Sequence, residues 1–216
     1  MQDIAIVKNY LKARYTFFKW RYNLAAVNKV TLAFGIACIT GLAAQIKISL
    51  PWTPVPITAQ TLTVLLSGVL LGRWYGGISQ AIYVIMGACG VPWFSGWSGG
   101  YQALFGPTGG YLIGFIFASL FLGHFTDKYI RARGFLPMLG LMIFANFLLI
   151  HIPGLLQLKL WLYLFKLELP TFKELLLMGS IPFVFGDMTK IFIAAMIAKI
   201  ITPKEAYNGE KDATKK

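Results

Sequence analysis

Residues 109–125 read GGYLIGFIFASLFLGHF, an apolar run without Asp, Glu, Lys or Arg that is followed by Asp127 and Lys128. A transmembrane helix needs roughly 20 mostly apolar residues, so this run is nearly long enough to cross a bilayer. The other residues have the same character, since 57% of the 216 are hydrophobic, 13% are charged and the mean hydropathy is +0.65. Soluble domains have about 45–50% apolar and about 25% charged residues. A water-soluble globular domain and a disordered chain are therefore excluded.

Five more apolar runs lie on either side of this stretch, each bounded by glycine, proline or charged residues. Together the six runs predict transmembrane helices at residues 30–46, 58–71, 78–90, 109–125, 136–158 and 175–200, with a tight turn at Gly76-Gly77. The last run follows a capping-box pattern, Thr171-Phe-Lys-Glu174, which is typical of a helix start. The predicted fold is an all-α integral membrane protein, a compact bundle of six transmembrane helices.

The basic residues predict how this bundle lies in the membrane. Cytoplasmic loops carry an excess of Lys and Arg. With six spans, fifteen of the 20 basic residues fall on the side of the N-terminus and four on the other side, while Lys190 lies within a span. We therefore expect a multi-pass protein of the cell membrane with both termini in the cytoplasm. The net charge of +12 has this origin, so it does not indicate a nucleic-acid partner.

The chain divides into three parts on this basis. Residues 1–29 mix basic and aromatic side chains and predict a cytoplasmic segment with an interfacial helix. Residues 30–201 form the six-helix membrane domain, and residues 202–216 form a polar, flexible cytoplasmic tail.

Asp187 and Lys190 are the first candidate binding residues, because both lie within the last predicted span. A spacing of three residues places them on one face of a helix. Charges at membrane depth are costly, and they mark functional sites by default. A buried structural ion pair is the alternative.

A glycine-rich segment, residues 92–111, is the second candidate. Its glycines can offer bare backbone N–H groups to a ligand, and Trp93, Trp97 and Tyr101 can form flat apolar walls. An aromatic belt at the membrane interface is the alternative. The segment lacks a Gly-Lys-Ser or Gly-Lys-Thr sequence and any basic residue, so it is not a nucleotide-binding loop.

Polar residues elsewhere give weaker signals. Gln60 follows the stiff Pro54-Val-Pro connector, where it either closes a pocket or caps a helix. Asn146 lies in the fifth span as a ligand contact or an interhelical hydrogen bond. His124 and His151 lack a spaced carboxylate or cysteine partner, so no metal site is predicted. Ala33, Ala37 and Gly41 form a small-residue stripe in the first span, which allows another helix to approach closely.

These motifs, taken in order, resemble the BioY family, the biotin-binding S components of energy-coupling-factor transporters. The resemblance covers roughly residues 30–200, and the matching segments are Ala33-xxx-Ala37, Pro54-Val-Pro-Ile-Thr-Ala-Gln60, Gly87-Ala-Cys-Gly-Val-Pro92, Gly106-Pro-Thr-Gly-Gly-Tyr111 and Phe185-Gly-Asp-Met-Thr-Lys190. It implies a subunit that captures biotin from outside with high affinity. It also implies docking, through the Ala33–Ala37 stripe, on a transmembrane coupling subunit driven by a pair of ATP-binding-cassette subunits.

The resemblance also assigns roles to residues. Asp187 accepts ureido N–H groups, Lys190 donates to a polar ligand atom, and Ser98 takes the place of a polar contact in the glycine-rich loop. Some family members have Arg after the Tyr of Gly-Gly-Tyr, where this chain has Leu112, so the group that binds the carboxylate stays open among the glycine N–H groups, Tyr101 and Gln102. The predicted substrate-binding residues are Asp187, Lys190, Ser98, Gln60, Gly99, Gly100, Gly109, Gly110, Tyr111 and Asn146, and the predicted docking residues are Ala33, Ala37 and Gly41.

Three alternatives remain beside biotin transport. The nearest is an S component for a different vitamin. An intramembrane enzyme needs a nucleophile with its base, or a metal cluster, and the sequence supplies neither, so no catalytic residue and no cofactor are predicted. A purely structural membrane subunit predicts no saturable ligand binding.

Overall fold

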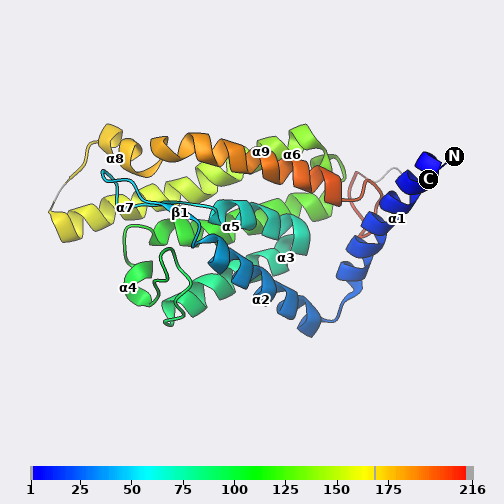
Figure 1. Cartoon of the computed structure of the whole chain (residues 1–216), viewed down its shortest axis with the longest axis horizontal. Helices are drawn as coiled ribbons and strands as arrows, with labels where there is room; N and C mark the ends of the chain where they lie inside the picture. The colour runs from blue at the N-terminus through cyan, green and yellow to red at the C-terminus, as the bar shows by residue number, and fades with distance from the viewer. Residues whose placement is uncertain (1, 168, 213–216) are drawn as a thin grey trace.

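The computed structural model describes residues 2–167 and 169–212, and most of them are helical. Long helices lie side by side as a bundle, and α1 lies across one end of it (Figure 1). The elements are α1 (Gln2–Asn23), α2 (Ala26–Ala43), β1 (Lys47–Ile48), β2 (Ile57–Thr58), α3 (Gln60–Ala88), α4 (Tyr101–Leu104), α5 (Gly109–Lys128), η1 (Arg131–Arg133), α6 (Phe135–Phe144), η2 (Ala145–Ile150), α7 (His151–Lys166), α8 (Phe172–Gly179), η3 (Ile181–Phe183) and α9 (Val184–Ile201).

Four helical segments of the described chain are long and apolar enough to cross a membrane, namely Ala26–Ala43, Gly109–Lys128, Phe135–Lys166 and Phe172–Ile201. The last three of these segments contain the fourth, fifth and sixth predicted spans, and Ala26–Ala43 overlaps the first, 30–46, which was predicted to end three residues later. The fifth runs beyond the predicted end at Leu158, because α6, η2 and α7 follow one another without a gap as one helical segment that continues past Pro153 to Lys166. The predicted capping box at Thr171 and Glu174 is confirmed.

Helix α3 covers most of the second and third predicted spans, 58–71 and 78–90, as two halves that fold back on each other. A Cβ added to Gly76 would lie 2.7 Å from the Cα of Gly68, a contact that eight residues of straight helix cannot make. The reversal occurs at Gly72, which has a φ of 78° that glycine adopts readily. The predicted turn at Gly76-Gly77 is therefore wrong: these two residues are helical, and their missing side chains let the two halves and α5 pack closely.

Helix α5 occupies the middle of the bundle, where it packs on α3, α7 and η2 (Figure 1). Its buried face includes Phe115 and Leu122, which belong to one continuous apolar core. This core holds the helix ends in fixed positions, so that loops at one end of the bundle can enclose a cavity.

Two connections close that end. Between α2 and α3, β1 and β2 pair in antiparallel register, Lys47 with Thr58 and Ile48 with Ile57. We call residues 47–58 the lid hairpin. Between α3 and α5, residues 91–108 form the glycine-rich loop that contains α4. The lid hairpin and this loop lie beside each other, since the Gln45 side chain binds the backbone of Trp93, Phe94 and Trp97.

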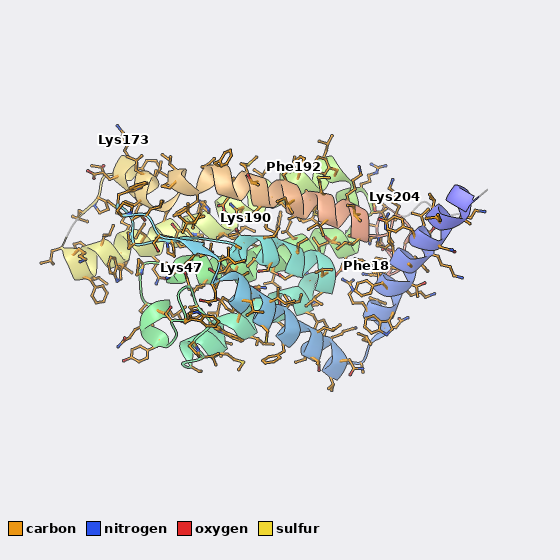
Figure 2. The ribbon with its side chains drawn as sticks, in the orientation of Figure 1. Phe18, Lys47, Lys173, Lys190, Phe192 and Lys204 are labelled. Atoms are coloured by element: carbon orange, nitrogen blue, oxygen red, sulfur yellow. The ribbon has the colours of Figure 1, made fainter. Side chains whose placement is uncertain are left out.

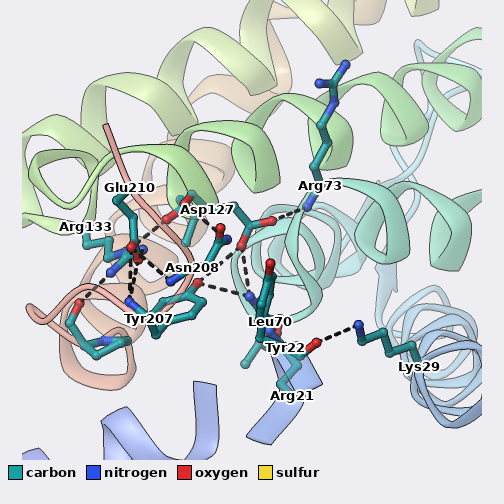
Figure 3. Close-up of polar contacts among 12 residues, drawn as sticks. Arg21, Tyr22, Lys29, Leu70, Arg73, Asp127, Arg133, Tyr207, Asn208 and Glu210 are labelled. Atoms are coloured by element: carbon teal, nitrogen blue, oxygen red, sulfur yellow. Dashed lines mark hydrogen bonds and ion pairs between the residues drawn. The ribbon is translucent and has the colours of Figure 1, made fainter. Parts of the chain in front are cut away.

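At the opposite end, the segment after α9 packs on the helix ends, although a flexible tail was predicted there. Tyr207 and Glu210 are buried, and the Arg133 side chain pairs with Glu210 (Figure 3). Arg21 of α1 donates to Asp127 and to the Tyr207 hydroxyl, at 2.9 and 3.0 Å. Phe18 points into the same cluster, with its ring 5.6 Å from that of Tyr207 (Figure 2). We call these residues the C-terminal clasp. The clasp ties α1 to the bundle, so residues 202–212 are part of the fold.

Candidate functional site

A cavity of about 560 Å³ lies under the lid hairpin and the glycine-rich loop. Its volume is within the usual range for small-molecule sites, roughly 300–1,000 Å³. Phe94, Leu112, Phe115, Ile150 and Phe183 supply apolar walls. The ionisable side chains that line it are Asp187, Lys190, His151, Lys47 and Tyr111. The cavity is therefore mostly apolar with a few placed polar groups, as a site for a small amphipathic molecule requires.

Asp187 is the centre of the polar network in this cavity. Its side chain is 4% exposed, and Oδ1 lies 2.6 Å from Lys190 Nζ. Asn146 Nδ2 and His151 Nε2 each lie 2.9 Å from Oδ2. Lys190 also donates to the backbone carbonyl of Thr58, at 2.9 Å. The buried carboxylate is thus neutralised and hydrogen-bonded, which is the condition for holding a charge away from water.

A break in the helix positions Asp187. Residues Ser180–Phe183 separate α8 from α9, and Asp187 lies in the first turn of α9. Backbone N–H groups at a helix start carry partial positive charge, which stabilises a carboxylate there. The capping box and the apolar run of the sequence do not reveal this second helix start.

The π-helical segment η2 positions the two partners of Oδ2. Hydrogen bonds in a π-helix join residues five apart, so Asn146 and His151, which are five residues apart, face the same carboxylate. His151 Nδ1 lies 2.9 Å from the Ser180 hydroxyl, which fixes the ring from its other side. Sequence reasoning missed His151 as a site residue, because its carboxylate partner is 36 residues away in the chain.

Six of the ten predicted substrate-binding residues line the cavity: Asp187, Lys190, Ser98, Gln60, Gly99 and Tyr111. Gln60 has both ends of its amide occupied, since it donates to the Tyr83 hydroxyl and accepts from the Thr58 hydroxyl. The Tyr111 hydroxyl donates to the Gly179 carbonyl, at 2.6 Å. Gln60 and Tyr111 therefore hold the cavity walls together as well as facing the cavity.

The other four, Gly100, Gly109, Gly110 and Asn146, do not line the cavity. The Gly100 N–H donates to the Gly87 carbonyl. A Cβ at Gly109 would lie 1.7 Å from the Leu104 oxygen, and one at Gly110 would lie 2.1 Å from the Pro153 oxygen. Gly109 and Gly110 therefore allow close backbone packing, Gly100 has a φ of 92°, and Asn146 contacts Asp187.

The predicted aromatic walls also differ, since Trp93, Trp97 and Tyr101 are not among the lining residues. Trp97 and Tyr101 are each 65% exposed, while Trp93 packs on Tyr83 and donates to its carbonyl. Phe94, Phe115, Phe183 and Tyr111 provide the aromatic surface instead.

The small-residue stripe of α2 is covered in this structure. Ala33 and Ala37 are fully buried, and a Cβ on Gly41 would lie 3.0 Å from Trp93 Cβ. The adjacent Thr40 accepts hydrogen bonds from Thr63 and Gln80 of α3, so this face of α2 lies on α3. A partner subunit can contact the stripe only if α2 moves away from α3.

Comparison with known proteins assigns the chain to a protein family. The BioY family model matches residues 14–206, which is most of the chain. The chain belongs to the BioY family. The region matched by the BioY model includes the lid hairpin, the glycine-rich loop and the Asp187 network. It also includes the clasp residues except Tyr207 and Glu210.

The sequences of known BioY proteins support this family assignment. A probable biotin transporter BioY from Methanothermobacter thermautotrophicus is 59% identical over 150 residues, covering 69% of this chain and 96% of the relative. The biotin transporter BioY of Thermotoga maritima is 36% identical over 152 residues, covering 70% and 83%.

A solved structure shares the fold. The S-component for biotin from an ECF-type ABC transporter aligns with a TM-score of 0.71 and 23% identity, covering 82% of this chain and 93% of that one. The BioY chain described here therefore has the fold of an S component.

Proposed function

We propose that this chain captures biotin at the outer face of the cell membrane, as the substrate-binding S component of an energy-coupling-factor transporter. One observation carries the proposal: the buried Asp187–Lys190 pair opens into a mostly apolar cavity of about 560 Å³. The names of the BioY relatives support biotin as the ligand.

The hydrogen-bonding capacity of the pair suits the ureido ring of biotin. A carboxylate has about four acceptor sites, and Lys190, His151 and Asn146 use three of those on Asp187. One site is left for a ureido N–H. Lys190 has three donors, two of which go to Asp187 and Thr58, so one is left for the ureido oxygen. The apolar walls match the thioether ring and the aliphatic chain.

The membrane arrangement belongs to the same proposal. We count six spans, with the two halves of α3 as the second and third, and place both termini in the cytoplasm. Arg73 lies at the same end as the C-terminal clasp, which itself contains Arg21 and Arg133 (Figure 3), and this agrees with an excess of positive charge inside. Active uptake then requires a transmembrane coupling subunit and a pair of ATPase subunits, because the sequence lacks a nucleotide-binding loop.

Binding by the purified chain tests the proposal. Biotin is titrated into the detergent-solubilised protein, with dethiobiotin, lipoate and riboflavin as competitors. We expect saturable binding of biotin, strong competition by dethiobiotin, which keeps the ureido ring, and none by riboflavin. Tighter binding of riboflavin or lipoate would indicate an S component for a different vitamin, and absence of saturable binding would indicate a structural subunit.

A further inference from the structure

A second cation lies at the mouth of the cavity. Lys47 of β1 lines the cavity, and its Nζ lies against the glycine-rich loop, 2.4 Å from the position a Cβ would take on Gly96. Gly96 has a φ of 75°, a conformation that favours glycine. The ammonium group therefore lies at the seam between the lid hairpin and the loop, where a side chain at position 96 would displace it. Figure 2 labels Lys47, which belongs to β1, and Lys190, which belongs to α9.

The two lysines of the cavity differ in their charge balance. Lys190 is paired with Asp187, the one acidic residue among the described side chains that line the cavity. Lys47 takes part in none of the salt bridges of residues 2–167 and 169–212. The mouth of the cavity therefore has a net positive charge that a bound anion can balance.

The residue before Gly96 adds a donor without a partner. Ser95 lines the cavity, and its Oγ is buried without a hydrogen-bond partner among the described residues. Buried polar atoms are normally paired, by protein, water or ligand. A carboxylate can accept charge-assisted hydrogen bonds from both an ammonium group and a hydroxyl, and such bonds are stronger than neutral ones.

Other donors near the mouth are weaker candidates. Position 112 is Leu, and Gly100, Gly109, Gly110 and Tyr101 do not line the cavity. Gly99 and Gln102 do line it, but neither carries charge. Lys47 is therefore the strongest candidate for an anionic ligand group.

We propose that Lys47 and Ser95 form the subsite for the carboxylate of the ligand, so that the ureido end lies at Asp187 and the acid end under the lid hairpin. This inference rests on the proposed biotin-binding function and adds how the chain distinguishes a free acid from its neutral derivatives. Lys47 then also ties the lid hairpin to the ligand, since it belongs to β1.

A thermodynamic cycle with two ligands tests it. Biotin and biotinamide, in which an uncharged amide replaces the carboxylate, are titrated into wild type, Lys47→Gln, Lys47→Arg and Ser95→Ala in detergent. Lys173→Gln is the matched control, because Lys173 is exposed and points away from the bundle (Figure 2). We expect Lys47→Gln to lower biotin affinity by about 3- to 10-fold, a modest change because Lys47 is exposed. Biotinamide affinity should stay unchanged, and Lys47→Arg and Lys173→Gln should behave as wild type.

The contrary outcomes are distinct. Equal losses for both ligands would make Lys47 a structural residue, and unchanged biotin binding by Lys47→Gln would remove it from the site. If Gln102→Ala, rather than Lys47→Gln, abolished the preference for biotin, the carboxylate would bind at Gln102. If the wild-type protein bound neither ligand, the proposed function itself would fail, and this subsite with it.

Discussion

Asp187 shows how a charge can be kept inside a membrane bundle. Three donors from three different elements surround it: Lys190 from α9, Asn146 from η2 and His151 from α7. Each partner compensates part of the cost of removing the carboxylate from water. Because all three donors hold the carboxylate in one orientation, the acceptor left for a ligand has a fixed position.

Asp187→Asn tests this at the level of one atom. The substitution keeps the shape but removes the charge and places an N–H₂ group where an acceptor stood. Hydrogen bonds to a charged group contribute about 1.5–3 kcal/mol, so we expect biotin affinity to fall by about 10- to 150-fold. Calorimetric titration of wild type and variant measures the change.

Lys190→Met should weaken binding too, and the double variant should lose less than the sum if both act on one ligand group. Thermal melts of the ligand-free proteins separate binding from stability. An unchanged dissociation constant beside a lowered melting temperature would make Asp187 a purely structural residue.

Breaks in helices place most of the site. The interruption at Ser180–Phe183 creates the helix start at Asp187, the π-helical segment η2 aligns Asn146 with His151, and the reversal at Gly72 brings the two halves of α3 together. Each break changes which residues face inward without changing the average hydropathy of the run. In α2 there is a packing feature instead of a break, since its small residues allow α3 to approach closely.

Ala37→Leu tests the role of the small-residue stripe. Ala37 is fully buried on the α3 side, and adding three carbons to a packed contact costs about 1–3 kcal/mol. We expect a lower melting temperature of the isolated chain, while Ala26→Leu, on the exposed start of the same helix, should change little.

Docking on a coupling subunit predicts a different pattern for Ala37→Leu. Whatever the change in melting temperature, biotin binding by the isolated chain would stay near normal, and uptake by the full transporter would fall. That pattern would show that the stripe is a docking surface and that α2 separates from α3 in the complex.

The whole molecule has a polar cluster at each end. The ligand cavity lies at one end and the C-terminal clasp at the other, with the apolar core between them. In the clasp, burial raises the pKa of Tyr207 to about 12, so its phenol stays protonated and can donate to Asp127. Burial alone would raise the pKa of Glu210, but hydrogen bonds from Arg133, Asn208 and Tyr207 lower it below its ordinary value.

Glu210→Gln is expected to destabilise the whole fold. It leaves the Arg133 guanidinium, which is 1% exposed, without its anionic partner, and breaking a buried pair costs about 3–5 kcal/mol. Thermal melts at neutral pH measure the loss. Glu205→Gln is the matched control, since Glu205 is exposed and lies five residues away. Equal melting temperatures for Glu210→Gln and wild type would contradict a structural role of the clasp.

The same pair predicts a pH dependence. Because the pKa of Glu210 is lowered in the folded chain, its contribution to stability is present above the pKa of the unfolded chain, about 4.3. It is lost as the pH falls through the lower folded value. We expect the wild-type melting temperature to drop between about pH 5 and about pH 3, and we expect a smaller drop in Glu210→Gln. Parallel pH profiles of the two proteins would contradict this.

The sequence alone determined the features that depend on neighbouring residues. Apolar runs and their breakers predicted a helical membrane bundle, the spacing of Asp187 and Lys190 predicted that they share one helix face, and Thr171 with Glu174 predicted a helix cap; the structure contains the last two as expected. These follow from helix periodicity and hydrogen bonding within a few residues.

Only the tertiary structure decided which side chains meet across the bundle. It placed His151 on Asp187 and Lys47 over Gly96, buried Ala33 and Ala37 under α3, and folded residues 202–212 into the clasp. Three local features rotate or reverse a segment: the π-helical insertion, the glycine at positive φ and the second helix start. Each involves only a few residues, so the sequence gives little sign of it. Which residues then come into contact depends on packing between segments far apart in the chain, and no local pattern records that.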